Sequence, residues 1–170
     1  MNILKAVLEH EVFPALGCTE PIAVAYAASL AGEKLGEEVQ AVAIVVDTAV
    51  YKNGFAVNVP GTDGERGNLI AGVLGALERK PHLKMENLQE VTSATVSRAR
   101  EIITAGAATI NYDATKRDLY IDVTISGAQH TARAVIEGSH TNVTLIELDG
   151  TPLFQGERHE TKQGKPYREA

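Results

Sequence analysis

The period of the hydrophobic pattern changes once along this chain, near Ala107, and this change constrains the fold more than any other feature. Before Ala107, apolar residues recur at helical spacing. After it, apolar and polar residues alternate, as they do from Leu119 to Ile125. The sequence therefore predicts an α+β fold. We expect a helical first half with one or two strands, followed by an antiparallel sheet of about four strands.

The first half divides into helices and one clear strand. Thr19 is expected to cap an alanine-rich helix that is apolar on most sides and therefore buried between layers. The glycines of residues 54–67 are expected to interrupt any long element there. The expected elements are a helix over 2–11, a helix from Thr19 to Gly36, a covered central strand over 39–47, and helices over 68–77 and 86–104.

The second half is a series of strands separated by turn residues. Asp149-Gly150 is a strong signal for a tight hairpin. The expected strands cover 119–125, 129–137, 142–148 and 151–155. We expect residues 1–155 to form one domain and residues 156–170 to form a polar tail.

Charge and composition exclude several classes of function. The net charge is −6, the pI is about 5.4 and tryptophan is absent. The acidic net charge and the low aromatic content, 5% of residues, argue against nucleic-acid binding, which needs a basic surface and aromatic stacking platforms. The longest apolar runs are too short to span a bilayer, and the N-terminus does not resemble a signal peptide, so we expect a cytoplasmic protein. The single cysteine, Cys18, excludes a disulfide scaffold and any metal site held only by this chain's thiolates.

The first motif that could carry chemistry is GCTEP, residues 17–21. A cysteine just before a helix lies in the positive potential of the helix N-terminus, which favours the thiolate. Cys18 could therefore be a nucleophile, a redox thiol or a metal ligand. The alternative is that Cys18 serves only as a small buried apolar residue, since free cysteines are often buried.

The second motif is the glycine-rich stretch KNGFAVNVPGTDGERG, residues 52–67. Lys52 could act as a base or bind a carboxylate, and Asn53 adds a polar group next to it. Gly61 and Thr62 lie where the backbone could form an anion-binding nest before the next helix. The alternative is a solvated loop.

The third motif is GSHTN, residues 138–142, at a break between two strands. Ser139, His140, Thr141 and Asn142 are four consecutive hydrogen-bonding side chains. His140 could transfer protons or orient a carboxylate. The alternative is a polar turn. The other four histidines are expected at the surface.

Taken together, PALGCTEPIAVAYAA, KNGFAVNVPGTDGERG and GSHTNVTLIELDG resemble the L-cysteine desulfidase and serine-dehydratase-alpha-like family. The three segments occur in that family's order and at similar separations. The resemblance implies a lyase that β-eliminates L-cysteine or L-serine to pyruvate and ammonia, with sulfide released from cysteine. It implies a [4Fe–4S] cluster, not pyridoxal phosphate, with Cys18 as one ligand. By the same resemblance, Lys52 and His140 are candidate bases. The expected substrate contacts are Asn53, Gly61, Thr62, Ser139, Thr141 and Asn142.

Two departures from that family matter. Its members are longer and carry their other cluster cysteines in a helical C-terminal half, whereas one thiolate cannot hold such a cluster. The charges of Asp63, Glu65 and Arg66 also replace residues that are small or apolar in the family.

The chain could be a subunit that needs a cysteine-bearing partner, one domain of a longer enzyme, or a non-catalytic module that binds a small amino or keto acid. We expect the isolated chain to be inactive and to associate through its apolar helix. A thiol enzyme that uses Cys18 with His140 is a third possibility and requires a lowered thiol pKa.

Overall fold

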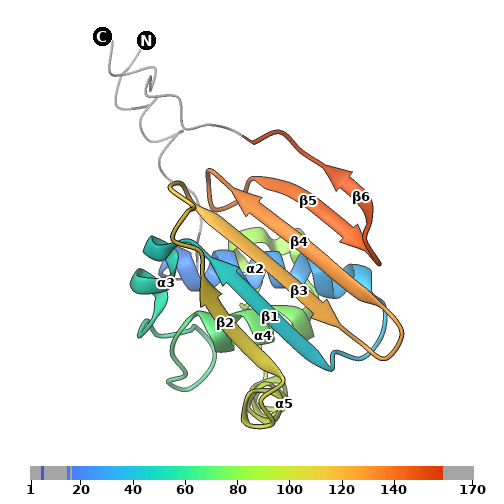
Figure 1. The fold of residues 1–170 in the computed structure, drawn as a ribbon. Coiled ribbons are helices and arrows are strands. Elements are labelled where there is room, and N and C mark those ends of the chain that lie inside the picture. The colour runs from blue at the N-terminus through green and yellow to red at the C-terminus, as the bar shows by residue number, and fades with distance from the viewer. Residues whose placement is uncertain (1–4, 6–14, 16, 159–170) are drawn as a thin grey trace.

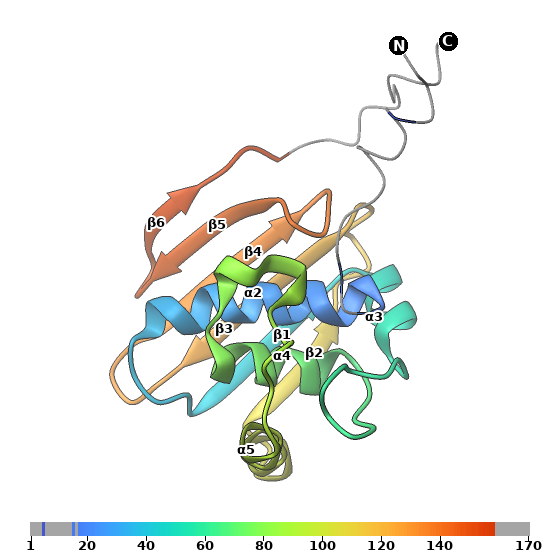
Figure 2. The same cartoon turned by 180° about the vertical axis from the view of Figure 1, so that it is seen from behind.

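A computed structural model describes residues 5, 15 and 17–158 of the chain. One six-stranded sheet is covered by helices on a single face (Figures 1 and 2). This arrangement confirms the predicted α+β class. In order, the elements are α2 (Thr19–Leu35), β1 (Ala41–Val46), α3 (Thr48–Gly54), α4 (Asn68–Glu78), the 3-10 helix η1 (Pro81–Glu86), α5 (Ser93–Thr104), β2 (Ala108–Tyr112), β3 (Tyr120–Ser126), β4 (Thr131–Glu137), β5 (Val143–Leu148) and β6 (Thr151–Gln155).

The sheet order is β2-β1-β3-β4-β5-β6, so the strand from the first half lies inside the sheet. β1 pairs in parallel with β2 and antiparallel with β3, and all the remaining pairs are antiparallel. The predicted antiparallel sheet of about four strands is confirmed as β3 to β6, and β1 and β2 extend it with one parallel pair at the edge. Helices cover one face of β1, where Val42, Ile44 and Val46 are buried, whereas Ala43 on the other face is exposed. The prediction that this strand is covered on both faces is therefore wrong.

The helix α2 is buried because it has neighbours on several sides. It lies on the sheet over β3 and β4, with α4 beside it and η1 against it (Figure 2). Small residues allow the helix backbones to approach: a Cβ on Gly32 would lie 2.5 Å from the carbonyl oxygen of Ala76. On the other helix, Gly75 packs in the same way against the backbone of Ala25. The alanine and glycine content of both helices therefore serves close packing.

Most predicted elements are present with shifted ends. Of the two caps predicted for α2, the C-cap is confirmed and the N-cap is wrong. Gly36 ends α2 at φ 70°, as expected. Cys18, not Thr19, is the N-cap of α2, and no side chain caps that end. The predicted helix over 86–104 is divided, because η1 ends at Glu86 and α5 begins only at Ser93. The hairpin at Asp149-Gly150 is confirmed, and both residues have positive φ, as a type I′ turn requires.

The structure contains one short helix that was not predicted, and it ends at Gly54, the first of the glycines expected to interrupt longer elements. α3 occupies residues 48–54, and its N-cap Asp47 accepts hydrogen bonds from the N–H groups of Ala49 and Val50. The predicted helix over 2–11 and most of the predicted tail lie outside the described residues. No helix among the described residues has both the length and the apolar character needed to cross a membrane.

Candidate functional site

Parts of the three sequence motifs meet at one end of the sheet. A Cβ on Gly17 would lie 3.3 Å from Cγ of Pro60, so the GCTEP segment touches the PGT loop. The imidazole of His140, in the turn between β4 and β5, interacts electrostatically with the carboxylates of Glu20 and Asp47. Both views show α3 next to the start of α2 (Figures 1 and 2). Segments far apart in sequence thus form one site.

Cys18 is exposed at the N-terminus of α2. Its thiol donates a hydrogen bond to Oε2 of Glu20 over 3.0 Å, and the hydroxyl of Thr19 donates to the same oxygen over 3.2 Å. Partial burial and then the Glu20 carboxylate raise the pKa of the Cys18 thiol. Burial and the nearby carboxylate therefore act against the thiolate that was expected at this helix end. This finding also counts against a thiol enzyme that uses Cys18 with His140.

Glu20 is a site residue that the motif analysis did not single out. Burial acts to raise its pKa, but the hydrogen bond from Cys18 and the nearby His140 lower the pKa overall. Glu20 therefore links the thiol to the imidazole of His140. The sequence signal that could have identified Glu20 is its position, two residues after a cysteine at the start of a helix.

His140 is partly buried, and that burial lowers the pKa of its imidazole, against the opposing effects of Glu20 and Asp47. A lowered pKa keeps the ring neutral near pH 7. A neutral imidazole can accept a proton, and the two carboxylates would then stabilise the resulting cation. His140 therefore has the properties of a general base.

Asp47 is the second residue that sequence reasoning missed. Oδ1 caps α3, while Oδ2 accepts a hydrogen bond of 2.8 Å from the N–H of Tyr120, where β3 begins. The side chain is almost completely buried. An aspartate directly after a strand and before a helix is a recognisable N-cap pattern, although its contact with Tyr120 depends on the tertiary fold.

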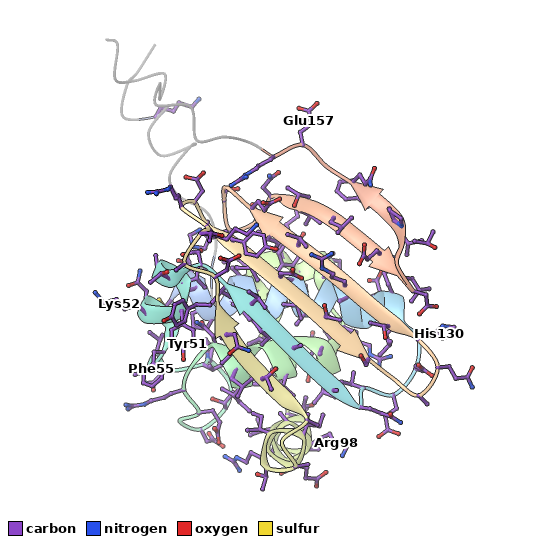
Figure 3. The ribbon with its side chains drawn as sticks, in the orientation of Figure 1. Tyr51, Lys52, Phe55, Arg98, His130 and Glu157 are labelled. Atoms are coloured by element: carbon purple, nitrogen blue, oxygen red, sulfur yellow. The ribbon has the colours of Figure 1, made fainter. Side chains whose placement is uncertain are left out.

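The two predicted residues of α3 lie at the surface. The side chain of Lys52 is exposed and points away from the molecule (Figure 3). Asn53 is also exposed. Neither has a recorded contact with Cys18 or His140 among the described residues, so the structure does not bring them into that cluster.

The predicted residues of the PGT loop shape the backbone. The hydroxyl of Thr62 is buried and donates a hydrogen bond of 2.6 Å to the carbonyl of Val59. Gly61 adopts φ 73°, close to the backbone of Leu88. Thr62 therefore holds the loop that Gly17 touches, and its hydroxyl is already engaged.

The GSHTN turn contains exposed and structural side chains. Ser139 and Thr141 are exposed. The amide of Asn142 donates hydrogen bonds to the carbonyls of Glu137 and Glu157, which fixes the turn and the segment after β6. Asn142 thus supports the turn that carries His140.

The described residues cannot by themselves hold a metal cluster. No group of three or more histidine, cysteine, aspartate or glutamate side chains is placed to bind a metal ion in the described part of the chain. Cys18 is nevertheless exposed at the edge of the site. An exposed thiol is accessible to a metal cluster, but one thiolate cannot hold a cluster alone.

Comparison with known proteins reveals relatives that are much longer than this chain. A UPF0597 protein of Geobacter sulfurreducens is 52% identical over 157 residues, which are 92% of this chain and 37% of that protein. UPF0597 proteins of Elusimicrobium minutum and Caldanaerobacter subterraneus are 41% and 38% identical and match 96% and 99% of this chain. The chain is homologous to part of the UPF0597 proteins. It spans 37–39% of the length of these three UPF0597 relatives. No protein-family model and no solved structure matches it.

Proposed function

We propose that this chain forms part of the active site of an iron–sulfur-dependent lyase that β-eliminates L-cysteine or L-serine. The observation that carries the proposal is the meeting of the GCTEP, PGT and GSHTN segments at one end of the sheet. These are the segments whose sequences resemble the L-cysteine desulfidase and serine-dehydratase-alpha-like family.

Cys18 would be one ligand of a [4Fe–4S] cluster. Such clusters usually need three or four thiolates, so the others must come from further polypeptide. The UPF0597 relatives contain such additional polypeptide, since this chain matches only 37–39% of the lengths of those compared. When bound, the cluster would supply a Lewis-acidic iron to the leaving group of the substrate.

His140 would remove the Cα proton of the substrate. The electron pair of the Cα–H bond forms the Cα–Cβ double bond, and the bond from Cβ to sulfur or oxygen breaks, so that the leaving group departs with that bond's electron pair as hydrosulfide or hydroxide. The product, aminoacrylate, tautomerises to an imine that water hydrolyses to pyruvate and ammonia. Glu20 and Asp47 would stabilise the imidazolium formed on His140. Of the two candidate bases, His140 is favoured because the side chain of Lys52 points away from the molecule.

Substrate contacts would come from the loops around His140. Ser139 and Thr141 are exposed and available to bind the carboxylate or amine of an amino acid. Gly61 is exposed as well, whereas Asn53 lies outside the cluster around His140 and is a less direct candidate. Thr62 and Asn142 would act by holding their loops in place, because their side chains already bond to backbone carbonyls.

The test is anaerobic reconstitution of the chain together with the remaining polypeptide of a UPF0597 relative. We expect cluster absorbance and pyruvate release from L-cysteine or L-serine. Cys18→Ala should lower the cluster content. His140→Gln should abolish pyruvate release while the cluster remains, and His130→Gln is the matched control because His130 lies at the opposite end of β4 (Figure 3).

Equal cluster content in the wild type and Cys18→Ala would refute the ligand assignment. Saturable binding of L-cysteine or L-serine without turnover, in a sample that holds a full cluster, would instead support the non-catalytic binding module.

A further inference from the structure

A cavity of about 230 Å³ lies between the end of α3, the start of α4 and strand β2. Its apolar wall consists of Tyr51, Phe55, Leu69 and Ile110. The rings of Tyr51 and Phe55 have centroids 6.4 Å apart, and the ring of Tyr51 is 5.2 Å from that of Tyr112. The volume is below the roughly 300–1,000 Å³ typical of sites for larger ligands, so the cavity suits a small molecule.

The polar side of the cavity is positive. Arg66 is the one charged residue among the described residues that line it. The recorded ion pairs of the described residues leave Arg66 without a carboxylate, since nearby Glu65 pairs with Arg100 instead. A guanidinium beside an apolar wall favours a ligand that has an anionic group on an apolar body.

The start of α4 adds to this positive character. Gly67 is the N-cap, and it has no side chain to bond the first N–H groups of the helix. Gly67, Asn68 and Leu69 all line the cavity. A carboxylate next to Arg66 would therefore also lie close to a helix end that favours negative charge.

Hydrogen bonds from the start of α4 to α3 and to the loop after α3 form the cavity in advance. The side-chain amide of Asn68 donates a bond of 2.9 Å to the carbonyl of Val50, and the N–H of Gly67 donates one of 2.9 Å to the carbonyl of Val57. Asn68 is buried, with 3% of its surface exposed. A preformed cavity binds its ligand without a large ordering cost.

We propose that this cavity binds a small organic carboxylate with an apolar body. The carboxylate lies against Arg66 and the start of α4, and the apolar body lies against Tyr51, Phe55 and Ile110. None of Cys18, Glu20 and His140 lines the cavity. The site is therefore distinct from the proposed lyase site, and its occupation requires neither a cluster nor turnover.

The test is calorimetric titration of the full chain with phenylpropionate. Two control compounds are titrated in the same way. Phenylpropionamide has the apolar body without the charge, and acetate has the charge without the apolar body. We expect saturable binding of phenylpropionate, with an affinity at least about tenfold higher than that of either control compound. Arg66→Gln should weaken binding about tenfold, and Phe55→Ala should weaken it several-fold.

Arg117→Gln is the matched control, because Arg117 is an exposed arginine outside the cavity. Residues 66 and 55 are both exposed, so neither substitution should unfold the chain, and circular dichroism verifies this. The proposal is overturned if phenylpropionate shows no saturable binding at millimolar concentration. Equal affinities for the acid and its amide, or equal effects of Arg66→Gln and Arg117→Gln, would also overturn it.

Discussion

One carboxylate, that of Asp47, connects three elements of the molecule. It caps α3, accepts the N–H of Tyr120 at the start of β3, and interacts electrostatically with His140 after β4. A buried group with so many partners is costly to remove, because each partner then loses its hydrogen bond away from water. Asp47 therefore supports both the fold and the candidate site.

Asp47→Ala should lower the free energy of unfolding by about 2–4 kcal/mol, which combines the loss of a helix cap with an unpaired buried N–H group. Urea unfolding measures the change. Asp118→Ala, at an exposed site, is the control and should change stability by less than about 0.5 kcal/mol. Equal effects of the two substitutions would mean that the hydrogen bonds of Asp47 contribute nothing.

His130 forms a second cluster of charges, at the opposite end of β4. Its Nδ1 lies 2.7 Å from Oδ2 of Asp149, and this contact raises the pKa of the imidazole. A raised folded-state pKa means that the contact stabilises the fold fully below the unfolded value of about 6.5. The stabilisation is lost as the pH rises through the folded-state pKa.

The melting temperature of the wild type should therefore exceed that of His130→Gln at about pH 6, with a smaller difference at about pH 9. Thermal unfolding followed by circular dichroism measures both values. A difference that stays constant or grows with pH would show that the imidazolium does not stabilise the fold.

At the level of elements, the closest packing is that between α2 and α4. A Cβ on Gly75 would lie 2.7 Å from the Cα of Ala25, and backbone atoms cannot easily move away. Gly75→Ala improves helix propensity by about 1 kcal/mol but forces the two helices apart.

We expect a net loss of about 1–3 kcal/mol for Gly75→Ala in urea unfolding. Ser97→Ala is the control, since residue 97 is an exposed position of α5 where alanine should be neutral or slightly stabilising. A stability gain for Gly75→Ala would indicate that α2 and α4 can separate without cost.

The elements that the sequence predicts well are those with a strong local pattern. α2 and α4 are dominated by apolar and small residues, and β3 to β6 alternate or follow clear turns. α3 and β2 were not predicted. α3 is a seven-residue helix whose cap also bonds to Tyr120, and β2 buries only Ala108. Both depend on long-range partners, which local periodicity does not reveal.

The candidate site likewise contains residues that the sequence predicts and partnerships that only the fold reveals. The motifs that contain Cys18 and His140 are visible in the sequence, because unusual residue types are adjacent there. The partnership of Glu20 and Asp47 with His140 joins separate elements and could be seen only in the fold. The position of Lys52 likewise depends on which side of α3 faces solvent.

At the scale of the whole molecule, neither neighbour of β1 belongs to the first half of the chain. A chain ended at residue 107 lacks β2 and β3, so β1 would have no sheet partner. We expect this shortened chain to show no cooperative unfolding transition, whereas the full chain unfolds cooperatively. A sharp urea transition for residues 1–107 would show that the helices form a stable unit without the sheet.

The position of β1 inside the sheet also determines when the protein can fold. Residues 41–46 leave the ribosome long before residues 108–126, with which they pair. Contacts so distant in sequence form slowly, and an unpaired apolar strand can associate with other chains in the meantime. The sheet therefore cannot assemble until residues 108–126 have been synthesised, and the apolar segment AVAIVV has no sheet partner until then.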